Sequence, residues 1–246
     1  MQCLILAGGL GSRMRPHTES RPKSLLLVEN RPFIDYQLTQ LSQSGVSRVV
    51  LCIGHQGEQI RDYVGDGECW GLDVTYVDEG RQLRGTAGAL ALALEEGELD
   101  DAFLVTYGDA FLPIDFREVW SAYLRSGQQA LMVVYQNQNR WDRSNCLYHV
   151  GRVLLYDKKN HAPEMRFIDY GVSVLSRDLV AREVPKNRPS DLADLFHQLS
   201  LRGELAGYCA KNRFYEIGSP TGVEDFARYL RRHSTSEEII SLSANN

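Results

Sequence analysis

Short apolar runs alternate with helical patterns along residues 1–136, and this alternation limits the possible folds more than any other feature. The apolar runs have the length of buried strands and read CLILA, RVVLCIG, LDVTYVD, AFLVTYGD and ALMVVYQ. Strands that alternate with helices are typical of a wound sheet built from βαβ units. The sequence therefore predicts an α/β fold with a Rossmann-like, mostly parallel sheet flanked by helices.

Two of the intervening segments carry clear helix signals. The segment FIDYQLTQLSQSG has helical apolar spacing and ends at Gly45, where we expect the helix to stop. The Ala- and Leu-rich segment TAGALALALEEG is predicted to begin with Thr86 as its N-cap and to end near Gly97.

After Arg140 the pattern changes to short strands and turns. The segments NCLYHVG, RVLLYDK and FIDYGVSVL are predicted to form a small β lid that covers the substrate. A helix over 190–201, a strand at GYCAK and an amphipathic helix at SPTGVEDFARYLRR follow. Because no repeat or Pro- or Ser-rich linker divides the chain, we predict one domain over residues 1–233 and a polar tail over 234–246.

Charge and composition exclude several classes of protein. The chain has 246 residues and a net charge of −5, which argues against a nucleic-acid partner. No apolar stretch reaches the roughly 18 residues that cross a bilayer, and we expect no signal peptide at residues 1–9. Five widely spaced cysteines form no CxxC pair, which indicates reduced thiols. We expect a cytoplasmic protein with no membrane partner.

A glycine-rich turn with two nearby cations follows the first predicted strand. Gly8, Gly9 and Gly11 have no Cβ atom, so the backbone there can approach a ligand and direct N–H groups at phosphate oxygens. A glycine pair alone would indicate only a tight turn. Arg13 adds a planar guanidinium and Lys23 a compact charge, and together they suit a triphosphate.

Other glycine and nucleophile motifs do not match. The dinucleotide motif GxGxxG, the P-loop motif GxxxxGKS/T and the hydrolase motif GxSxG do not occur in the chain. Asp109, in contrast, directly follows the apolar run AFLVTYG. The carboxyl ends of strands in α/β sheets face the crevice where ligands bind, so Asp109 is a candidate site residue. A turn aspartate that only closes the strand is the alternative.

The segment GGLGSRMRPHTESRPKSLLLV resembles the signature of sugar-1-phosphate nucleotidyltransferases, GGxGxRLxPxTxxxPKxLLPV. Met14 and Leu27 depart from that pattern. The short length and the ending EIGSPTGVEDFARYL resemble the short heptose and mannose 1-phosphate guanylyltransferases. The resemblance implies an enzyme of the 2.7.7 class that forms an NDP-sugar and pyrophosphate, most simply from GTP and a heptose or hexose 1-phosphate. Uridylyl or cytidylyl transfer to another sugar phosphate or a phosphonate, and a non-catalytic nucleotide-sugar sensor, remain as alternatives.

The resemblance also implies the site residues. Catalytic roles fall to Arg13, Lys23 and Asp109, and a magnesium ion would be held by Asp109 and Glu216. The sugar phosphate would contact Lys158, Asp169 and Gly171, with Arg143 or Asn145 as further candidates. Nucleotide contacts are implied for Leu6, Ala7, Gly8, Gly9, Gly11, Ser12, Arg13, Lys23, Glu79, Gly85 and Thr86.

Simpler interpretations stay open for several of these residues. Glu216 could cap the helix that begins near Pro220, and Glu79 could be solvated rather than bound to a guanine edge. Lys158 could lie in a solvated turn. On the resemblance, the domain divides into a nucleotide-binding core at about 1–135 and a part that binds sugar phosphate at about 136–233.

Overall fold

The computed structural model describes residues 1–16, 18–80, 82, 84–186 and 188–243, and the side chains of all of these except Arg13 and residues 234–243. Within this part of the chain, a central sheet has nine strands in the order β5-β4-β1-β6-β11-β8-β12-β10-β9. Their bounds are β1 (Gln2–Leu6), β4 (Arg48–Ile53), β5 (Asp73–Asp78), β6 (Ala102–Tyr107), β8 (Ala130–Gln136), β9 (Cys146–His149), β10 (Arg152–Tyr156), β11 (Phe167–Ser176) and β12 (Leu205–Ala210).

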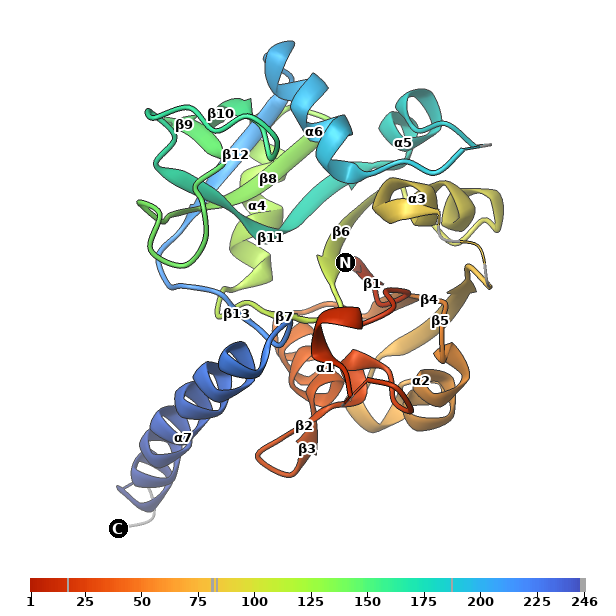
Figure 1. Cartoon of the computed structure of the whole chain (residues 1–246), viewed down its shortest axis with the longest axis vertical. Coiled ribbons are helices and arrows are strands. Elements are labelled where there is room, and N and C mark those ends of the chain that lie inside the picture. Colours follow the sequence, from red (N-terminus) through yellow and green to blue (C-terminus); the bar gives the residue numbers. More distant parts are fainter. Residues whose placement is uncertain (17, 81, 83, 187, 244–246) are drawn as a thin grey trace.

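The sheet is parallel in its first half and mixed in its second. β5, β4, β1 and β6 run parallel to one another, and β8 pairs in parallel with β12. β11 lies between β6 and β8 and is antiparallel to both. The predicted α/β fold with helices on both faces of the sheet is confirmed (Figure 1).

Two helical layers bury the two faces of the sheet. One apolar cluster packs α1 (Phe33–Gln43), α2 (Gly57–Val64) and α4 (Phe116–Ser126) on one face. A second cluster packs α3 (Gly85–Glu95), α5 (Arg177–Glu183) and α6 (Leu192–Leu201) on the other. Because each helix buries an apolar stripe against the sheet, the hydrophobic effect holds the three layers together.

The last helix, α7 (Pro220–Ser243), lies outside these layers and projects from the body (Figure 1). Phe226 on its first turns is fully buried against Phe33 and Phe111, with ring centroids 5.3 and 4.8 Å away. The backbone of α7 continues through most of the segment that the sequence predicts as a polar tail. No helix in the described part of the chain is long and apolar enough to span a membrane.

Two small ladders complete the fold. β2 (Leu27–Val28) pairs with β3 (Arg31–Pro32), and β7 (Ala110–Phe111) pairs with β13 (Tyr215–Glu216). The second ladder matters for the site, because it joins the end of β6 to a segment more than one hundred residues later.

The three strands predicted as a lid belong to the main sheet. β9 and β10 form its edge, and β11 lies at its centre. The reason is burial: the ten-residue β11 is apolar enough to be covered on both faces, with Val172, Val174 and Leu175 at most 2% exposed. A strand of this kind is more stable inside a sheet than in a solvated lid.

The predicted helix ends are partly correct. Gly45 and Gly97 follow α1 and α3 with φ angles of 77°, the left-handed conformation that glycine adopts at helix ends, as expected. Thr86 as N-cap was a wrong prediction, since α3 begins at Gly85 and its N-cap is Arg84. The Thr86 hydroxyl bonds to the Leu192 amide and to the Asp191 carboxylate and not to an amide of α3.

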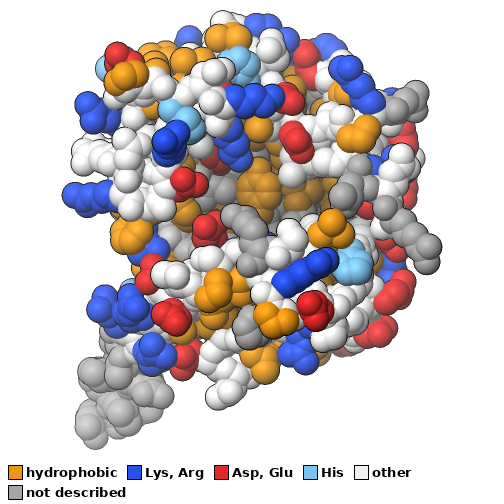
Figure 2. Space-filling model, in the orientation of Figure 1, with side chains coloured by type: hydrophobic (Ala, Val, Ile, Leu, Met, Phe, Trp, Pro, Cys, Tyr) orange, Lys and Arg blue, Asp and Glu red, His pale blue; other side chains and the backbone are white. Residues whose placement is uncertain are grey.

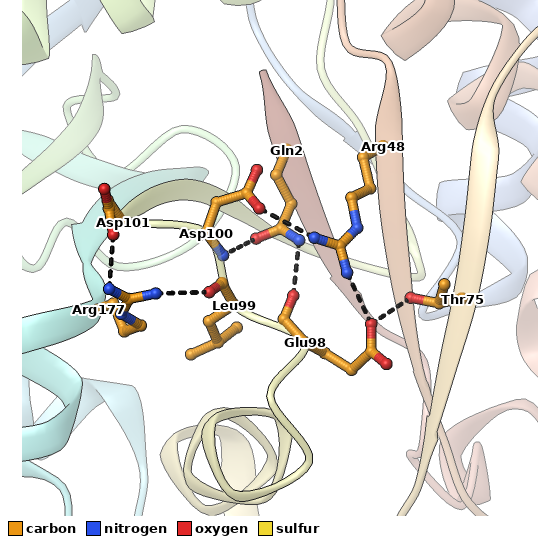
Figure 3. Close-up of polar contacts among 8 residues, drawn as sticks. All are labelled: Gln2, Arg48, Thr75, Glu98, Leu99, Asp100, Asp101 and Arg177. Carbon is orange, nitrogen blue, oxygen red and sulfur yellow. Dashed lines mark hydrogen bonds and ion pairs between the residues drawn. The ribbon is translucent and has the colours of Figure 1, made fainter.

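A polar network ties together the amino ends of the parallel strands (Figure 3). The buried side chain of Gln2 donates to the Glu98 carbonyl and accepts from the Asp100 amide, at 2.7 and 2.9 Å. Arg48 pairs with the carboxylates of Glu98 and Asp100, both at 2.9 Å, and Thr75 donates to Glu98. These contacts hold the amino ends of β1, β4 and β6 together, at the end of the sheet opposite to the carboxyl ends of these strands.

Candidate active site

A cleft with two adjoining hollows lies at the carboxyl ends of β1 and β6. The first hollow is lined by Leu6, Ala7, Gly8, Gly9, Lys23, Ser24, Glu79, Arg84, Gly85, Thr86, Ala89, Tyr107, Gly108, Asp109 and Asp191. The second is lined mainly by side chains from the later half of the chain, including Trp141, Asp142, Asn145, Lys158, Asp169, Gly171, Arg213, Glu216 and Asp225. Tyr107 and Asp109 line both hollows. Figure 2 shows the recess in the middle of this face, with apolar side chains at its floor and charged ones around it.

The glycine turn supplies backbone to the first hollow. A Cβ atom on Gly8 would lie 2.5 Å from the Oε1 atom of Glu79, so the backbone there is packed directly against this carboxylate. A Cβ atom on Gly9 would meet nothing within 4 Å, which places the open side of the turn at this residue. Gly11 and Ser12 form the next turn and do not line the hollow. The side chain of Arg13 lies outside the described part of the chain.

Lys23 and Asp109 meet at the junction of the two hollows. Lys23 lies on a short 3-10 helix after Pro22, and Asp109 follows β6. The Nζ atom of Lys23 lies 2.7 Å from Oδ2 of Asp109, and the two side chains are 17% and 26% exposed. Two residues that the sequence predicts for one site are thus in direct contact. A partly buried ion pair of this kind holds both charges in a fixed position beside the cleft.

Glu216 reaches the same junction through the small β7–β13 ladder. Glu216 is paired with Ala110 in register, and the amide of Ile217 donates to the Asp109 carbonyl at 2.9 Å. Both carboxylates line the second hollow. No group of three potential metal ligands exists among the described residues. Two carboxylates beside an open cleft fit Mg²⁺, which binds one or two carboxylates with water and substrate phosphate, better than a zinc site closed by protein ligands.

The predicted sugar-phosphate residues lie together in the second hollow. Asp169 accepts hydrogen bonds from the Gly171 amide at 3.0 Å and from the Tyr156 hydroxyl at 3.3 Å. Gly171 has a φ of 98°, lies where the β11–β8 pairing is irregular, and lines the hollow. Lys158 lines the hollow and forms no ion pair with a described residue.

Of the two further candidates, only Asn145 lines the hollow. Its Oδ1 atom accepts from the Asp169 amide at 3.0 Å, so Asn145 also holds Asp169 in place. Arg143 is exposed and does not line it.

The start of α3 is occupied by protein groups. The Asp191 carboxylate accepts from the Thr86 amide at 3.1 Å, and the Ser190 carbonyl accepts from the amides of Ala87 and Gly88. The Thr86 hydroxyl accepts from the Leu192 amide at 2.8 Å and thereby supports the start of α6. Thr86 faces the first hollow, but these three amides of α3 are already used. The amide of Thr86, a predicted nucleotide contact, is thus already bonded to a protein group.

Three titratable groups that line the cleft, Glu79, Tyr107 and Tyr170, have pKa values raised by burial. Burial raises the pKa of Glu79, while the amide and the charge of Arg84 oppose this shift. Burial also raises the pKa of Tyr107, and the negative charges of Asp169, Asp109 and Asp191 add to the effect. Tyr107 therefore stays a neutral hydroxyl between the two hollows.

The far wall of the second hollow contains residues that sequence reasoning missed. The guanidinium carbon of Arg213 lies 3.5 Å from the ring centroid of Trp141 and 4.5 Å from that of Tyr215. Arg213 also pairs with Asp225 at 3.2 Å. The four residues come from three separate segments, so no local motif marks them. The only sequence signal was an isolated tryptophan in a polar loop, and Trp141 is indeed 47% exposed.

Comparison with known proteins places this cleft in a family. The fold and the cleft define an α/β protein with a ligand-binding crevice at the carboxyl ends of its parallel strands. The family model for nucleotidyl transferases matches residues 2–143, and the chain belongs to this family. The family predicted from the glycine turn and its cations is thereby confirmed.

Individual relatives differ in length and in the nucleotide that they are named for. The chain is 25% identical over 234 residues to the D-glycero-alpha-D-manno-heptose 1-phosphate guanylyltransferase of Aneurinibacillus thermoaerophilus, covering 95% of this chain and all of that protein. It is 41% identical over 118 residues to the N-acetylmuramate alpha-1-phosphate uridylyltransferase of Neisseria meningitidis, covering 47% of this chain and 50% of the relative. For two other relatives, from Haloferax volcanii and Streptomyces antibioticus, the match spans only 31% of their length.

A solved structure shows the same fold over nearly the whole chain. The UDP-glucose pyrophosphorylase complexed with UDP-glucose superposes with a TM-score of 0.77 at 17% identity, covering 94% of this chain and 98% of that one. At this identity the likeness concerns the fold alone.

Proposed function

We propose that this protein transfers a nucleotidyl group from a nucleoside triphosphate to a sugar 1-phosphate and releases pyrophosphate. The observation that carries the proposal is the contact between Lys23 and Asp109 where two hollows meet. A triphosphate in the first hollow and a sugar phosphate in the second would place the α-phosphorus and the attacking oxygen at this junction. The site residues implied by the resemblance are part of the same proposal.

The chemistry needs positioning and charge neutralisation rather than a strong base. The attacking phosphate oxygen is already an anion, so no proton must be removed before the new P–O bond forms. The bond to the pyrophosphate breaks in the same displacement, and pyrophosphate leaves with its negative charge. Lys23 would neutralise the triphosphate and Lys158 the incoming phosphate, while backbone at Gly8 and Gly9 would contact phosphate oxygens.

Asp109 and Glu216 would hold the magnesium ion. When bound, the ion supplies positive charge to the phosphate oxygens of the reacting centre. Lys23 already contacts one oxygen of Asp109, so this lysine would also fix the orientation of the carboxylate. The pairing of Glu216 with Ala110 holds the backbone of the second acid at this end of the cleft.

GTP is the proposed nucleotide, and Glu79 is the reason. Its carboxylate lines the first hollow, lies against Gly8 and belongs to a half-buried residue. A carboxylate can accept hydrogen bonds from the adjacent N1–H and N2–H groups of guanine. Uracil offers a single N–H group between two carbonyl oxygens, which would be repelled. The relative that matches over its full length is named as a guanylyltransferase.

A neutral sugar, a heptose or hexose 1-phosphate, is the proposed acceptor. The second hollow contains more acids than bases: Asp109, Asp142, Asp169, Glu216 and Asp225 against Lys158 and Arg213. Arg213 is already paired with Asp225. Carboxylates accept hydrogen bonds from sugar hydroxyls and repel a second anionic group, so an acidic sugar should be disfavoured.

The test is pyrophosphate release with four nucleoside triphosphates and a panel of neutral and acidic sugar 1-phosphates. We expect turnover that depends on magnesium, with preference for GTP and a neutral sugar. Asp109→Asn should lower turnover by at least about 100-fold while the protein still unfolds cooperatively. Asp178→Asn, on the exposed start of α5, is the control and should keep full activity.

Three outcomes would change the proposal. Normal turnover of Asp109→Asn would overturn the role of Asp109 as a metal ligand. Preference for UTP or CTP would move the protein to the alternative transferase classes. Binding of nucleotide without turnover across the whole panel would indicate a nucleotide-sugar sensor.

A further inference from the structure

A third hollow lies outside the cleft, on the other side of Arg84. It is lined by Gln82, Arg84, Gly88, Lys186, Arg188 and Pro189, and we call it the basic hollow. Three of its six lining residues are cations and none is acidic. This concentration of positive charge occurs in a chain with a net charge of −5.

The cations of the basic hollow are not paired within the described part of the chain. None of Arg84, Lys186 and Arg188 forms an ion pair there. Cations on the adjoining helices behave differently, since Arg182 and Arg202 both pair with Glu183. Arg188 also lines a neighbouring hollow that contains acids, yet Arg188 itself forms no ion pair with a described residue. Unpaired cations grouped around one hollow are typical of a site that receives an anion from outside.

The side chain of Arg84 is a second, independent indication that the basic hollow receives an anion. Its Nε atom is buried and has no hydrogen-bond partner. Buried polar atoms in folded proteins nearly always have a partner, so an unpartnered guanidinium nitrogen indicates a missing acceptor. The start of α3 does not explain the hollow, because its amides are bonded to Ser190 and Asp191.

We propose that the basic hollow binds the phosphate group of a small molecule, either inorganic phosphate or a phosphorylated metabolite. Guanidinium groups match the oxygens of a phosphate with paired N–H donors, and a lysine adds a flexible charge. The net negative charge of the chain and the small size of the hollow disfavour a nucleic acid as ligand. Arg84 lines both this hollow and the first hollow of the cleft. Phosphate bound in the basic hollow would therefore partly neutralise the positive charge of Arg84 and weaken its attraction for the nucleotide.

The experiment measures phosphate binding to the full chain by calorimetry. Inorganic phosphate is titrated into wild type and into Lys186→Ala/Arg188→Ala, each with and without saturating GTP to occupy the cleft. A charge-matched control, Arg125→Ala/Arg152→Ala, removes two cations that form no ion pair with a described residue and lie on α4 and β10. We expect wild type and control to bind phosphate in the presence of GTP, and the double variant to bind at least about tenfold more weakly.

Two results would overturn the proposal. Equal phosphate affinity of wild type and the double variant would show that these cations bind no phosphate. Loss of all phosphate binding when GTP is added to wild type would show that phosphate occupies only the cleft. Because the readout is binding, it does not depend on turnover, and a failure of the proposed reaction would be seen separately in the pyrophosphate assay.

Discussion

Gly85→Ala should lower the free energy of unfolding more than Gly97→Ala, although the two glycines have nearly the same positive φ angle at opposite ends of α3. Their φ angles are 74° and 77°. A Cβ atom at Gly97 meets nothing within 4 Å, whereas at Gly85 it would lie 2.5 Å from the Ser190 carbonyl oxygen and 2.9 Å from Oδ1 of Asp191. The loss of unfolding free energy in Gly97→Ala should therefore come from the left-handed conformation alone, about 1–2 kcal/mol. In Gly85→Ala the steric collision of the new Cβ atom adds to this loss.

The size of the collision term follows from the hydrogen bonds that it disturbs. An ordinary contact of carbon with a carbonyl oxygen is about 3.3 Å, so the loop at Ser190 would have to move by about 0.8 Å. The Ser190 carbonyl accepts from two amides of α3, each hydrogen bond worth about 1 kcal/mol. We expect the free energy of unfolding of Gly85→Ala to be about 2 kcal/mol below that of Gly97→Ala.

Urea unfolding would measure this difference. With a denaturant slope of about 3 kcal/mol/M, the midpoint of Gly85→Ala should lie roughly 0.7 M below that of Gly97→Ala. Gly85→Ala should also raise the KM for the nucleotide, because Gly85 lines the first hollow and Gly97 does not. Equal midpoints for the two variants would refute the argument that the Ser190 loop packs directly on Gly85.

Gly9→Ala completes the series. Gly9 does not have a left-handed φ, and there is space for a Cβ atom at this position. The free energy of unfolding of Gly9→Ala should therefore equal that of wild type, but the added methyl group would stand where the nucleotide binds. The expected pattern is a raised KM for the nucleotide with an unchanged urea midpoint. An unchanged KM would place the nucleotide elsewhere.

Three further predictions concern single side chains. Burial raises the pKa of Glu79. The favourable contribution of this residue to the free energy of unfolding is therefore present below about pH 4.5 and is lost as the pH rises through the pKa of the folded state. Glu79→Gln should melt at a higher temperature than wild type at pH 7, and the difference should close at acid pH. Lys158→Ala should raise the KM for the sugar phosphate and leave that for the nucleotide unchanged, whereas Lys159→Ala, at an exposed ion pair, should alter neither; the opposite pattern would exchange the roles of the two hollows. Glu98→Gln should weaken the contact with Arg48 and lower the free energy of unfolding by about 1 kcal/mol at full activity, because this network lies at the other end of the strands; a loss of activity at unchanged stability would contradict this.

Local patterns in the sequence determined the elements and one half of the site. Strand and helix periods are properties of neighbouring residues, so the first strands and the ends of α1 and α3 could be predicted to within a residue or two. The glycine turn is also local, because Gly8 and Gly9 follow β1 directly and their lack of a Cβ atom has its effect at that position. The rule that ligands bind at the carboxyl ends of strands was enough to select Asp109.

Tertiary structure alone decided which distant residues became partners. Lys23 and Asp109 are 86 positions apart, and Thr86 and Asp191 are 105 apart, so no spacing rule could pair them. The same holds for the stacking of Arg213 on Trp141 and for the central place of β11, which depends on burial of both its faces between β6 and β8. A sequence pattern records what each segment buries and which groups it carries. Which segments then lie side by side depends on how the whole chain covers its apolar surface, and this is a property of the folded chain.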